Sequence, residues 1–443
     1  MAKKKVAFVC VSCGAESPKW SGRCVSCGEW NSIVETDAEP KKITAENISF
    51  TKLSDISTDS RKRIITGINE FDLVCGGGIV PGAVTLIGGE PGIGKSTLAL
   101  QVASKMKTLY VSGEESPQQI KHRAERLKIS GSNITMTSNT IVEEIADIIM
   151  KDKPECVFID SVQTISSISC QGPAGSVAQI RESTLRLSEL AKKMDIPLFV
   201  IGHINKEGSI AGPKVLEHVV DTVLYFEGDF THDFRILRAF KNRFGSVNEI
   251  GLFRMESSGL IEISDKNSIF LNPYSTESPG TAVCAAIEGS RTILFEVQSL
   301  VSFSSFSNPR RMADGFDLNR LILLIAVLEK HAACKLSQFD VFLNVAGGFQ
   351  INETASDLAV AVSIASSYKE KPIPEKTGFL GEISLSGEIR PVSQALRRIQ
   401  EFERNGFTKL FASEKESREI SKSVFSGQVI PVRSVNRVID FIF

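Results

Sequence analysis

A glycine-rich run, Gly89-Glu-Pro-Gly-Ile-Gly-Lys-Ser96, has the spacing G-x-x-x-x-G-K-S, which is typical of a loop that binds phosphates. Its glycines let backbone amides wrap the phosphates, while Lys95 reaches the β- and γ-phosphates and Ser96 ligates Mg2+. The run lies between an apolar stretch at 83–87 and a helical pattern at 97–105, which is the strand–loop–helix context that this chemistry needs. We therefore predict that ATP and Mg2+ bind at this phosphate loop, residues 89–96. The expected ATP-binding residues are Gly89, Glu90, Pro91, Gly92, Ile93, Gly94, Lys95, Ser96 and Thr97.

A second acidic element could complete the same site. Asp160 ends the apolar run 155–159 and has the form of the carboxylate that holds Mg2+ together with Ser96. Many buried strands end in Asp as a turn residue, so the interpretation depends on the phosphate loop being present in the same chain.

Two adjacent carboxylates, Glu114 and Glu115, follow another strand-like run at 109–113. A carboxylate at the carboxyl edge of a parallel sheet could polarise the water that attacks the γ-phosphate, and we favour Glu114 for this role. The alternative is that one or both acids only start the helix after Pro117, where negative charge is favourable.

His203 follows the apolar run 197–201 and could contact the γ-phosphate, although a lone histidine is more often structural. The polar, glycine-containing segments 166–177 and 207–213 follow two of these strands. Such loops suit mobile contact with a ligand, and the alternative is plain surface connection.

Four cysteines form two C-x2-C pairs separated by ten residues: Cys10, Cys13, Cys24 and Cys27. Two such pairs place four thiolates around a tetrahedral zinc ion. Because four cysteines close the coordination shell, we predict a structural site whose metal supplies the folding energy of a small module. The alternatives are incidental thiols or a redox dithiol pair. The other cysteines are scattered and are interpreted as small core residues: Cys75, Cys156, Cys170, Cys284 and Cys334.

The composition limits the class of protein that positions these groups. Of 443 residues, 42% are hydrophobic and 23% charged, so neither a disordered chain nor a fibrous repeat is expected. The 51 Lys and Arg balance 52 Asp and Glu, which excludes a polycationic nucleic-acid coat but permits local basic patches. The longest apolar run, 321–328, has 8 residues, whereas a membrane-spanning helix needs about 20. With no secretory signal and nine cysteines that suit a reducing compartment, we expect a cytoplasmic protein.

The apolar pattern divides the chain into three units of the α/β class. Residues 1–35 form the four-cysteine zinc finger, and 36–63 are a linker. Residues 64–265 alternate strand-like runs with helical segments, which predicts a P-loop core with a mainly parallel sheet. A second linker, 266–280, leads to a C-terminal α/β domain at 281–443. The strands that we expect are 83–87, 108–111, 156–159, 197–201, 282–287 and 292–300, and the C-terminal helices are 319–331 and 356–367.

The pentapeptide Lys241, Asn242, Arg243, Phe244, Gly245 is a further motif. Together with the four-cysteine finger and the phosphate loop, it resembles the bacterial RadA/Sms family of DNA-repair ATPases over essentially the whole chain. The resemblance implies a RecA-like core in a hexameric ring, similar to DnaB-type helicases, that binds single-stranded and branched DNA and acts with the RecA recombinase in recombinational repair. It also implies that Lys241 and Arg243 act across a subunit interface. The two cations alternate along a strand-like run and so point to one face, and the alternative is a solvated basic edge strand.

The C-terminal domain resembles the Lon-type peptidase fold. In that family a serine in G-P-S-A-G and a lysine in G-G-L-K form the catalytic dyad, and the corresponding residues here are Ala355 and Leu396. A shift of one residue would bring Ser356 to the first position, but no lysine lies between Lys376 and Lys409. The resemblance therefore implies the fold without protease activity. Basic residues support a structural and DNA-binding role: Arg310, Arg311, Arg390, Arg397 and Arg398.

Three functions compete on these observations. A ring-forming, DNA-dependent ATPase that processes or branch-migrates recombination intermediates accounts for all the motifs together. An ATP-dependent protease would need the Ser-Lys dyad. A nucleotide-binding regulator or kinase, similar to the clock ATPases, would account for the paired acids but not for the pentapeptide or the finger. We favour the motor, with these catalytic residues: Lys95, Glu114, Asp160, His203, Lys241 and Arg243.

Overall fold

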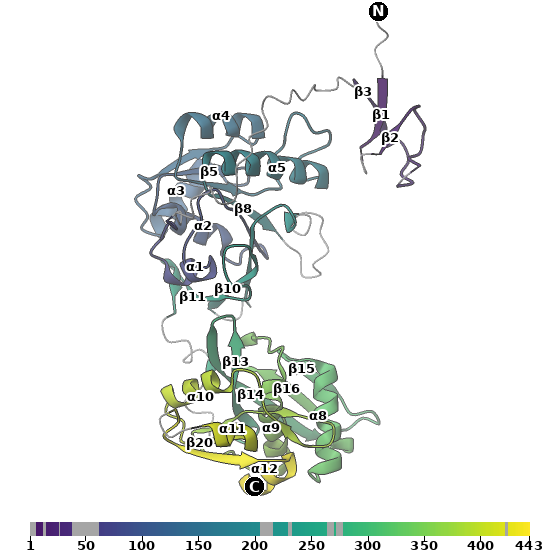
Figure 1. Cartoon of the computed structure of the whole chain (residues 1–443), viewed down its shortest axis with the longest axis vertical. Helices are drawn as coiled ribbons and strands as arrows, with labels where there is room; N and C mark the ends of the chain where they lie inside the picture. Colours follow the sequence, from purple (N-terminus) through teal and green to yellow (C-terminus); the bar gives the residue numbers. More distant parts are fainter. Residues whose placement is uncertain are drawn as a thin grey trace, which may run out of the picture.

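The computed structural model shows a small N-terminal β-module, a nine-stranded sheet with its helices, and a seven-stranded sheet with its helices (Figure 1). The two large sheets are stacked along the long axis of the molecule, and the chain ends in the second of them (Figure 1). The residues that the structure describes are 6–11, 15–25, 27–37, 62–203, 216–228, 233–263, 270–271, 278–420 and 424–443.

The N-terminal module is a three-stranded antiparallel sheet in the order β2-β1-β3. Its strands are β1 (Val6–Cys10), β2 (Glu16–Ser17) and β3 (Ile33–Asp37). Among its described residues, the buried apolar cluster consists of Cys10, Cys24 and Ile33. Three side chains bury too little apolar surface to stabilise such a module, so its folding needs another source of free energy, such as a bound metal.

The nine-stranded sheet has the order β12-β11-β10-β9-β4-β8-β7-β5-β6. Its strands are β4 (Val84–Gly89), β5 (Thr108–Ser112), β6 (Ile134–Thr137), β7 (Cys156–Asp160), β8 (Leu198–His203), β9 (Thr222–Glu227), β10 (Phe234–Asn242), β11 (Ile250–Glu256) and β12 (Gly259–Glu262). The strands from β9 to β6 in this order pair in parallel, and β10 to β12 extend the sheet by antiparallel pairs. The sheet is therefore mainly parallel, as the sequence predicts.

Helices cover both faces of this sheet. Helices α1 (Asn69–Val74), α2 (Lys95–Ala103) and α3 (Pro117–Arg126) contribute to one buried cluster, and α4 (Val142–Asp152) and α5 (Val177–Met194) contribute to another. Strands β4, β5 and β7 are buried along their whole length, which explains why they are continuous apolar runs in the sequence. The expected strands and the helix after the phosphate loop are confirmed, with ends displaced by at most two residues.

The C-terminal sheet has the order β15-β16-β14-β13-β17-β20-β21 and mixed strand directions. Its strands are β13 (Thr281–Glu288), β14 (Arg291–Phe303), β15 (Arg311–Asp314), β16 (Phe339–Val345), β17 (Thr377–Phe379), β20 (Lys409–Ser413) and β21 (Gln428–Val432), with a separate hairpin of β18 (Glu382–Ile383) and β19 (Ile389–Arg390). The helices are α8 (Leu318–His331), α9 (Asp357–Lys369), α10 (Ala395–Arg404), α11 (Glu414–Glu419) and α12 (Val435–Ile442), with single 3-10 turns η4 (Leu336–Gln338), η5 (Ala346–Gly348) and η6 (Thr354–Ser356). The two strands and two helices expected here are confirmed.

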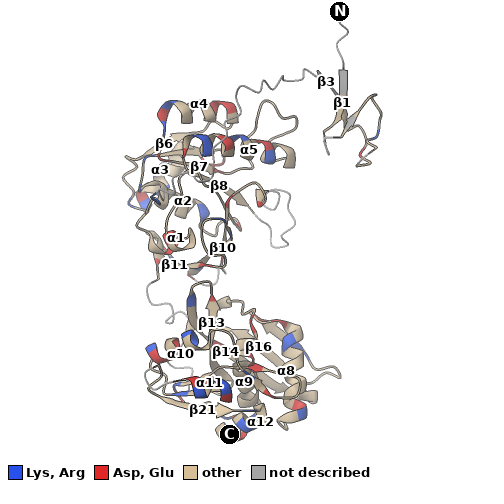
Figure 2. Cartoon of the chain, viewed as in Figure 1, with Lys and Arg blue, Asp and Glu red and all other residues tan. Residues whose placement is uncertain are grey.

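Charge is spread over the surface of both large domains. Blue and red segments alternate along α4, α5 and α10, so these helices carry both signs (Figure 2). This distribution agrees with the balanced composition, and any contact with a polyanion must come from a local group of cations.

The hairpin formed by β13 and β14 joins the two large domains. At its tip, the Arg291 guanidinium donates to both carboxylate oxygens of Glu70 at 2.5 and 2.8 Å, and Glu70 also accepts the Leu252 amide at 2.8 Å. A second ion pair links Arg238 of β10 to Glu288 of β13. Apolar side chains from both domains form one buried cluster beneath these pairs: Phe234, Ile236, Ile250, Leu252, Phe270, Phe295 and Phe349. The hairpin therefore packs into the nine-stranded sheet as part of a shared core.

We expect Arg291→Ala to lower the stability of both domains together. The substitution leaves the buried Glu70 carboxylate without its cation, which costs about 3–5 kcal/mol for a pair of this kind. The urea midpoint of the shared unfolding transition, followed by far-UV circular dichroism, measures the change. The control is Lys121→Ala, which removes an exposed pair with Glu125 on α3 and should change the midpoint little. Equal effects of the two variants would contradict a stabilising role of the hairpin pair.

Candidate functional site

The phosphate loop connects β4 to α2 at the carboxyl edge of the parallel strands. Gly94 ends the loop with a φ of 122°, and a Cβ atom there would lie 2.7 Å from Cε of Met255, so this position requires glycine. Helix α2 has no side-chain N-cap. Its first amides are therefore available to an anion, which the helix dipole also favours.

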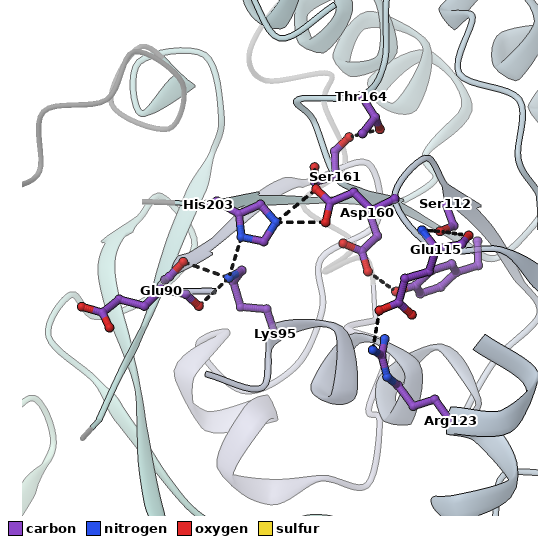
Figure 3. Close-up of polar contacts among 12 residues, drawn as sticks. Glu90, Lys95, Ser112, Glu115, Arg123, Asp160, Ser161, Thr164 and His203 are labelled. Carbon is purple, nitrogen blue, oxygen red and sulfur yellow. Dashed lines mark hydrogen bonds and ion pairs between the residues drawn. The ribbon is translucent and has the colours of Figure 1, made fainter. Parts of the chain in front are cut away.

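Lys95 lies in a polar group formed at the carboxyl ends of four strands, β4, β5, β7 and β8 (Figure 3). Its ammonium donates to the carbonyls of Gly89 and Glu90, both at 2.8 Å, and lies 3.3 Å from Nδ1 of His203. Burial is the main cause that lowers the pKa of Lys95 to about 8, against the opposing effect of nearby carboxylates. The lysine is held inside the loop that would receive the phosphates.

Glu114 faces this group and Glu115 does not. Nε2 of His203 lies 3.1 Å from Oε1 of Glu114, and the Ser161 hydroxyl donates to the same oxygen. Glu115 instead forms an ion pair with Arg123 of α3 at 2.5 Å. Glu114 therefore lies at the phosphate loop, and Glu115 contacts the following helix.

Asp160 ends β7 beside the first turn of α2. Its carboxylate accepts the Tyr110 hydroxyl at 2.7 Å, and burial raises its pKa although hydrogen bonds from Tyr110 and Ser96 oppose the change. Carboxylate and hydroxyl oxygens are the ligands that Mg2+ prefers. The Asp160 carboxylate and the Ser96 hydroxyl thus fit the ion that the sequence predicts.

Lys241 and Arg243 contact one short segment, Leu216–Asp221, which we call the anchor segment. The Lys241 ammonium donates to two of its backbone carbonyls at 2.6 and 2.8 Å. The Arg243 guanidinium donates to Asp221 at 3.2 Å, and its side chain is 55% exposed. The expectation that both cations lie on one side of the strand agrees with this geometry, although a β-bulge interrupts β10 just before Lys241.

The other residues of the pentapeptide hold its backbone in place. The Asn242 side chain donates to the Val74 carbonyl at 3.4 Å and accepts the Phe244 amide at 2.9 Å. The Phe244 carbonyl accepts Nη2 of Arg63 at 2.5 Å. A Cβ atom on Gly245 would lie 2.8 Å from Cα of Gly76, so only glycine fits this approach.

Arg243 lies at the opposite edge of the sheet from the phosphate loop of its own chain. Asn242 pairs with Thr222 on β9, Thr222 pairs with Thr85 near the start of β4, and the phosphate loop leaves β4 at Gly89. Asn242 and Gly89 are thus four residues apart along the strand direction and two strands apart across the sheet. With a rise of roughly 3.3 Å per residue and a spacing of roughly 4.8 Å between strands, the distance between them is about 16 Å. This distance exceeds the reach of an arginine side chain.

Three of the four zinc-finger cysteines lie among the described residues. The sulfur atoms of Cys10, Cys24 and Cys27 all lie within 4.8 Å of one another, and Cys10 and Cys27 are 3.6 Å apart. Tetrahedral zinc with Zn–S bonds of about 2.3 Å needs sulfur atoms about 3.8 Å apart, so the arrangement fits the ion. Cys13 lies outside the described residues.

An ion pair ties together the two elements that a Ser-Lys dyad would occupy. Ala355 lies buried in η6, and Leu396 is half exposed on α10. Two residues away from each, Glu353 and Arg398 form a double hydrogen-bonded pair, and the Ser356 hydroxyl donates to the Glu353 carbonyl. The position next to the expected serine therefore carries a hydroxyl whose hydrogen bond goes to the backbone.

The expectation that Arg398 supports DNA binding is wrong. Its side chain is 1% exposed and donates to Glu353 and to the Ala285 carbonyl, so it belongs to the core of the domain. Arg311 is also engaged, with carbonyls of Leu336 and Phe339. Arg310 is exposed and lies over the Phe306 ring at 4.4 Å from its centroid. Sequence alone could not identify Arg398 as buried, because its burial depends on how α10 packs against the rest of the domain.

Of the two polar segments expected to contact a ligand, the first is tethered. The Gln179 amide of α5 accepts the Ser167 amide at 2.8 Å and donates to the Cys170 carbonyl at 2.6 Å. Helix α5 begins at Val177, inside the expected segment. The second segment, 207–213, lies outside the described residues.

Sequence patterns missed three residues of the site. Tyr110 and Ser161 support Asp160 and Glu114, and Asp221 supports Arg243. Tyr110 sits inside an apolar run and Ser161 in a strand-end turn, so neither has a sequence signal. Asp221 follows two valines at a strand start, where an acid is usually a turn residue.

Parts of the chain match three known domain families. Residues 8–35 match the rubredoxin metal binding domain, residues 64–139 match KaiC, and residues 324–416 match subunit ChlI of Mg-chelatase. The metal-binding match and the sulfur geometry support structural zinc, and the ATPase match and the phosphate loop support ATP with Mg2+.

Two curated relatives align with the chain from end to end. The DNA repair protein RadA of Streptococcus pyogenes serotype M1 is 48% identical over 456 aligned positions, which cover 100% of both chains. The DNA repair protein RadA of Pseudomonas aeruginosa is 44% identical over 455 positions, again covering 100% of both. A crystal structure of the RadB recombinase overlaps 45% of this chain and 99% of its own, with a TM-score of 0.38 and 21% identity.

Within the described ranges, every helix is too short or too polar to cross a lipid bilayer.

We expect the purified chain to contain about one zinc ion, and Cys24→Ala to lose it, because three thiolates bind the ion far more weakly than four. Inductively coupled plasma mass spectrometry gives the stoichiometry, and nucleotide binding by the rest of the chain should persist. The matched control is Cys75→Ala, a buried cysteine outside the cluster, which should keep the metal. A wild-type protein without zinc would refute the assignment.

Proposed function

We propose that this chain, which belongs to the RadA family of DNA repair proteins, is a DNA-dependent ATPase that forms a ring, binds single-stranded DNA and promotes processing or branch migration of recombination intermediates. The family and the RecA-like ATPase core supply the premise. The ring, the DNA forms and the roles of individual residues are the proposal.

The polar group around Lys95 supports hydrolysis of ATP. Loop amides and the α2 N-terminus bind the phosphates, and Lys95 leaves the loop carbonyls to pair with the β- and γ-phosphates. The Ser96 hydroxyl and the Asp160 carboxylate would hold Mg2+, which would supply positive charge beside the phosphates.

Glu114 is the residue that we assign to the attacking water. Its Oε1 accepts the Ser161 hydroxyl, and both of its carboxylate oxygens lie within 3.2 Å of Nε2 of His203, so the carboxylate is held at the edge of the phosphate loop. His203 lies between Glu114 and Lys95, so it contacts the group that moves when the γ-phosphate is present or lost. We propose that His203 reports the state of the γ-phosphate to the rest of the chain.

The distance between Arg243 and the phosphate loop of its own chain is the observation that best supports a ring. A half-exposed arginine at the far edge of the sheet cannot serve the nucleotide of its own chain, but head-to-tail packing would bring it to the loop of the next subunit. We propose that Lys241 and Arg243 act in this way, and that the ring is hexameric, as the family resemblance implies.

Exposed aromatic and cationic side chains of the C-terminal domain support contact with single-stranded DNA. Phe303 and Phe306 are 69% and 57% exposed, and Arg310 lies over the second ring. Bases stack on such rings while arginine meets the phosphates. By family resemblance we also propose branched DNA and the RecA recombinase as partners, a cytoplasmic location, and domain limits at 64–265 and 281–443.

The competing functions have less support. A protease would need a nucleophile and a base where the chain has Ala355 and Leu396. A nucleotide-binding regulator similar to KaiC would account for the ATPase match alone. Casein hydrolysis in the presence of ATP would favour the protease, whereas strong stimulation of ATP hydrolysis by single-stranded DNA favours the motor.

Lys95→Ala should abolish ATP hydrolysis in the presence of single-stranded DNA, because it removes the cation that neutralises the γ-phosphate. The rate of phosphate release with and without single-stranded DNA is the measurement. Lys193→Ala, an exposed lysine on α5, is the control and should turn over normally. Near-normal turnover of the Lys95 variant would show that this loop is not the catalytic site.

Arg243→Ala should bind ATP normally and hydrolyse it about 10³ to 10⁵ times more slowly, as other hydrolases do without their arginine finger. Mixing it with Lys95→Ala should restore activity, because about a quarter of head-to-tail interfaces then join an intact loop to an intact arginine. Arg254→Ala, an exposed arginine of the same sheet, is the control. If mixed rings form and gain nothing, Lys241 and Arg243 do not act in trans.

A further inference from the structure

Asp221 holds Arg243 by both its side chain and its backbone. The Asp221 carboxylate accepts Nη1 of Arg243 at 3.2 Å, and the Asp221 carbonyl accepts the Arg243 amide at 3.2 Å. Asp221 is 3% exposed, whereas the Arg243 side chain is 55% exposed. The buried Asp221 carboxylate thus binds one nitrogen of the Arg243 guanidinium, while more than half of the Arg243 side chain stays exposed to solvent.

Asp221 is itself fixed to the strand that leads to the phosphate loop. Its amide donates to the Val84 carbonyl at 2.9 Å, and its carboxylate accepts the Val84 amide at 3.2 Å. Val84 is the first residue of β4, and the loop lies at the other end of that strand. The position of Arg243 is therefore defined relative to the rigid centre of the sheet.

The charges around Asp221 come from two elements besides β9. Lys192 of α5 approaches the carboxylate at 3.3 Å, and Arg243 approaches from the end of β10. Lys241 lies on the same anchor segment through the Glu217 and Val220 carbonyls. Lys192 already supplies a positive charge to the buried Asp221 carboxylate. The carboxylate therefore does not need Arg243 for charge compensation, and we look for another role for the Asp221–Arg243 contact.

We propose that Asp221 is a positioning residue that orients Arg243 toward the nucleotide of the neighbouring subunit. This inference rests on the proposed action of Arg243 in trans. Without the carboxylate, the long guanidinium side chain would sample many rotamers, and each departure from the productive geometry slows the reaction. The carboxylate would act on catalysis in the next subunit and leave ATP binding in its own subunit unchanged.

Asp221→Asn tests this role because it keeps the size and one acceptor oxygen for Val84 while removing the charge. We expect kcat for ATP to fall by about 10- to 100-fold, as it does when a reacting group is displaced by about 1 Å, while KM and the ATP dissociation constant change by less than about twofold. Lys192→Met removes the other cation from the same carboxylate and should leave kcat unchanged. A raised KM with normal kcat would overturn the proposal, because it would place the effect in the subunit's own β4 and phosphate loop.

Mixing experiments assign the defect to one side of the interface. Asp221→Asn mixed with Lys95→Ala should regain activity, because the Asn variant keeps an intact loop and the Ala variant keeps an oriented arginine. The double variant Asp221→Asn/Arg243→Ala should be no slower than Arg243→Ala, since the carboxylate acts only through the arginine. An additive loss, or no recovery in rings shown to be mixed, would overturn the positioning role.

The outcomes separate this inference from the function on which it rests. If Arg243→Ala hydrolyses ATP at the normal rate, the action in trans is refuted whatever Asp221 does. If Arg243→Ala is slow and Asp221→Asn is normal, the action in trans stands and the positioning role is refuted.

Discussion

The buried central strand β4 is the constraint on which the site depends. It lies between two parallel neighbours, β8 and β9, and all six of its residues are buried. One end carries the phosphate loop and the other carries the bonds to Asp221. Because a strand is stiff and has a set rise per residue, the phosphate site and Arg243 are held at opposite edges of the sheet. This separation of the phosphate loop and Arg243 within one chain is the basis of the proposed action of Arg243 in trans.

The buried charges of Lys95 and Asp160 at the carboxyl edge need hydrogen-bond partners, which the structure supplies from β4, β5 and β8. Lys95 uses two loop carbonyls and His203, and Asp160 uses Tyr110. These bonds offset the cost of removing the two ionised groups from water, whereas Glu114 is exposed and accepts a hydrogen bond from Ser161. These partners also orient the oxygen and nitrogen atoms that would meet the phosphates, so the requirements of stability and of chemistry coincide.

In the C-terminal α/β domain, an ion pair lies between the two elements that carry the positions expected for a peptidase dyad. Glu353 and Arg398 tie η6 to α10 where a dyad would join them, and the β13–β14 hairpin carries Arg291 into the ATPase domain. Arg238 lies on β10, the strand that leads to Lys241 and Arg243, and pairs with Glu288 of this hairpin. The C-terminal domain thus supports the strand that bears the cations.

Sequence patterns alone determined the phosphate loop, the cysteine pairs, six of the strands and the fold class, because each depends on local spacing or on burial of whole strands. They also selected Asp160, Glu114 and His203 by their place at strand ends. Tertiary structure decided which of two adjacent acids faces the site, that Arg398 is a core residue, and that Arg243 is held by Asp221. These facts depend on which distant segments pack together. The local sequence pattern around a residue does not show which distant residues it contacts in the fold.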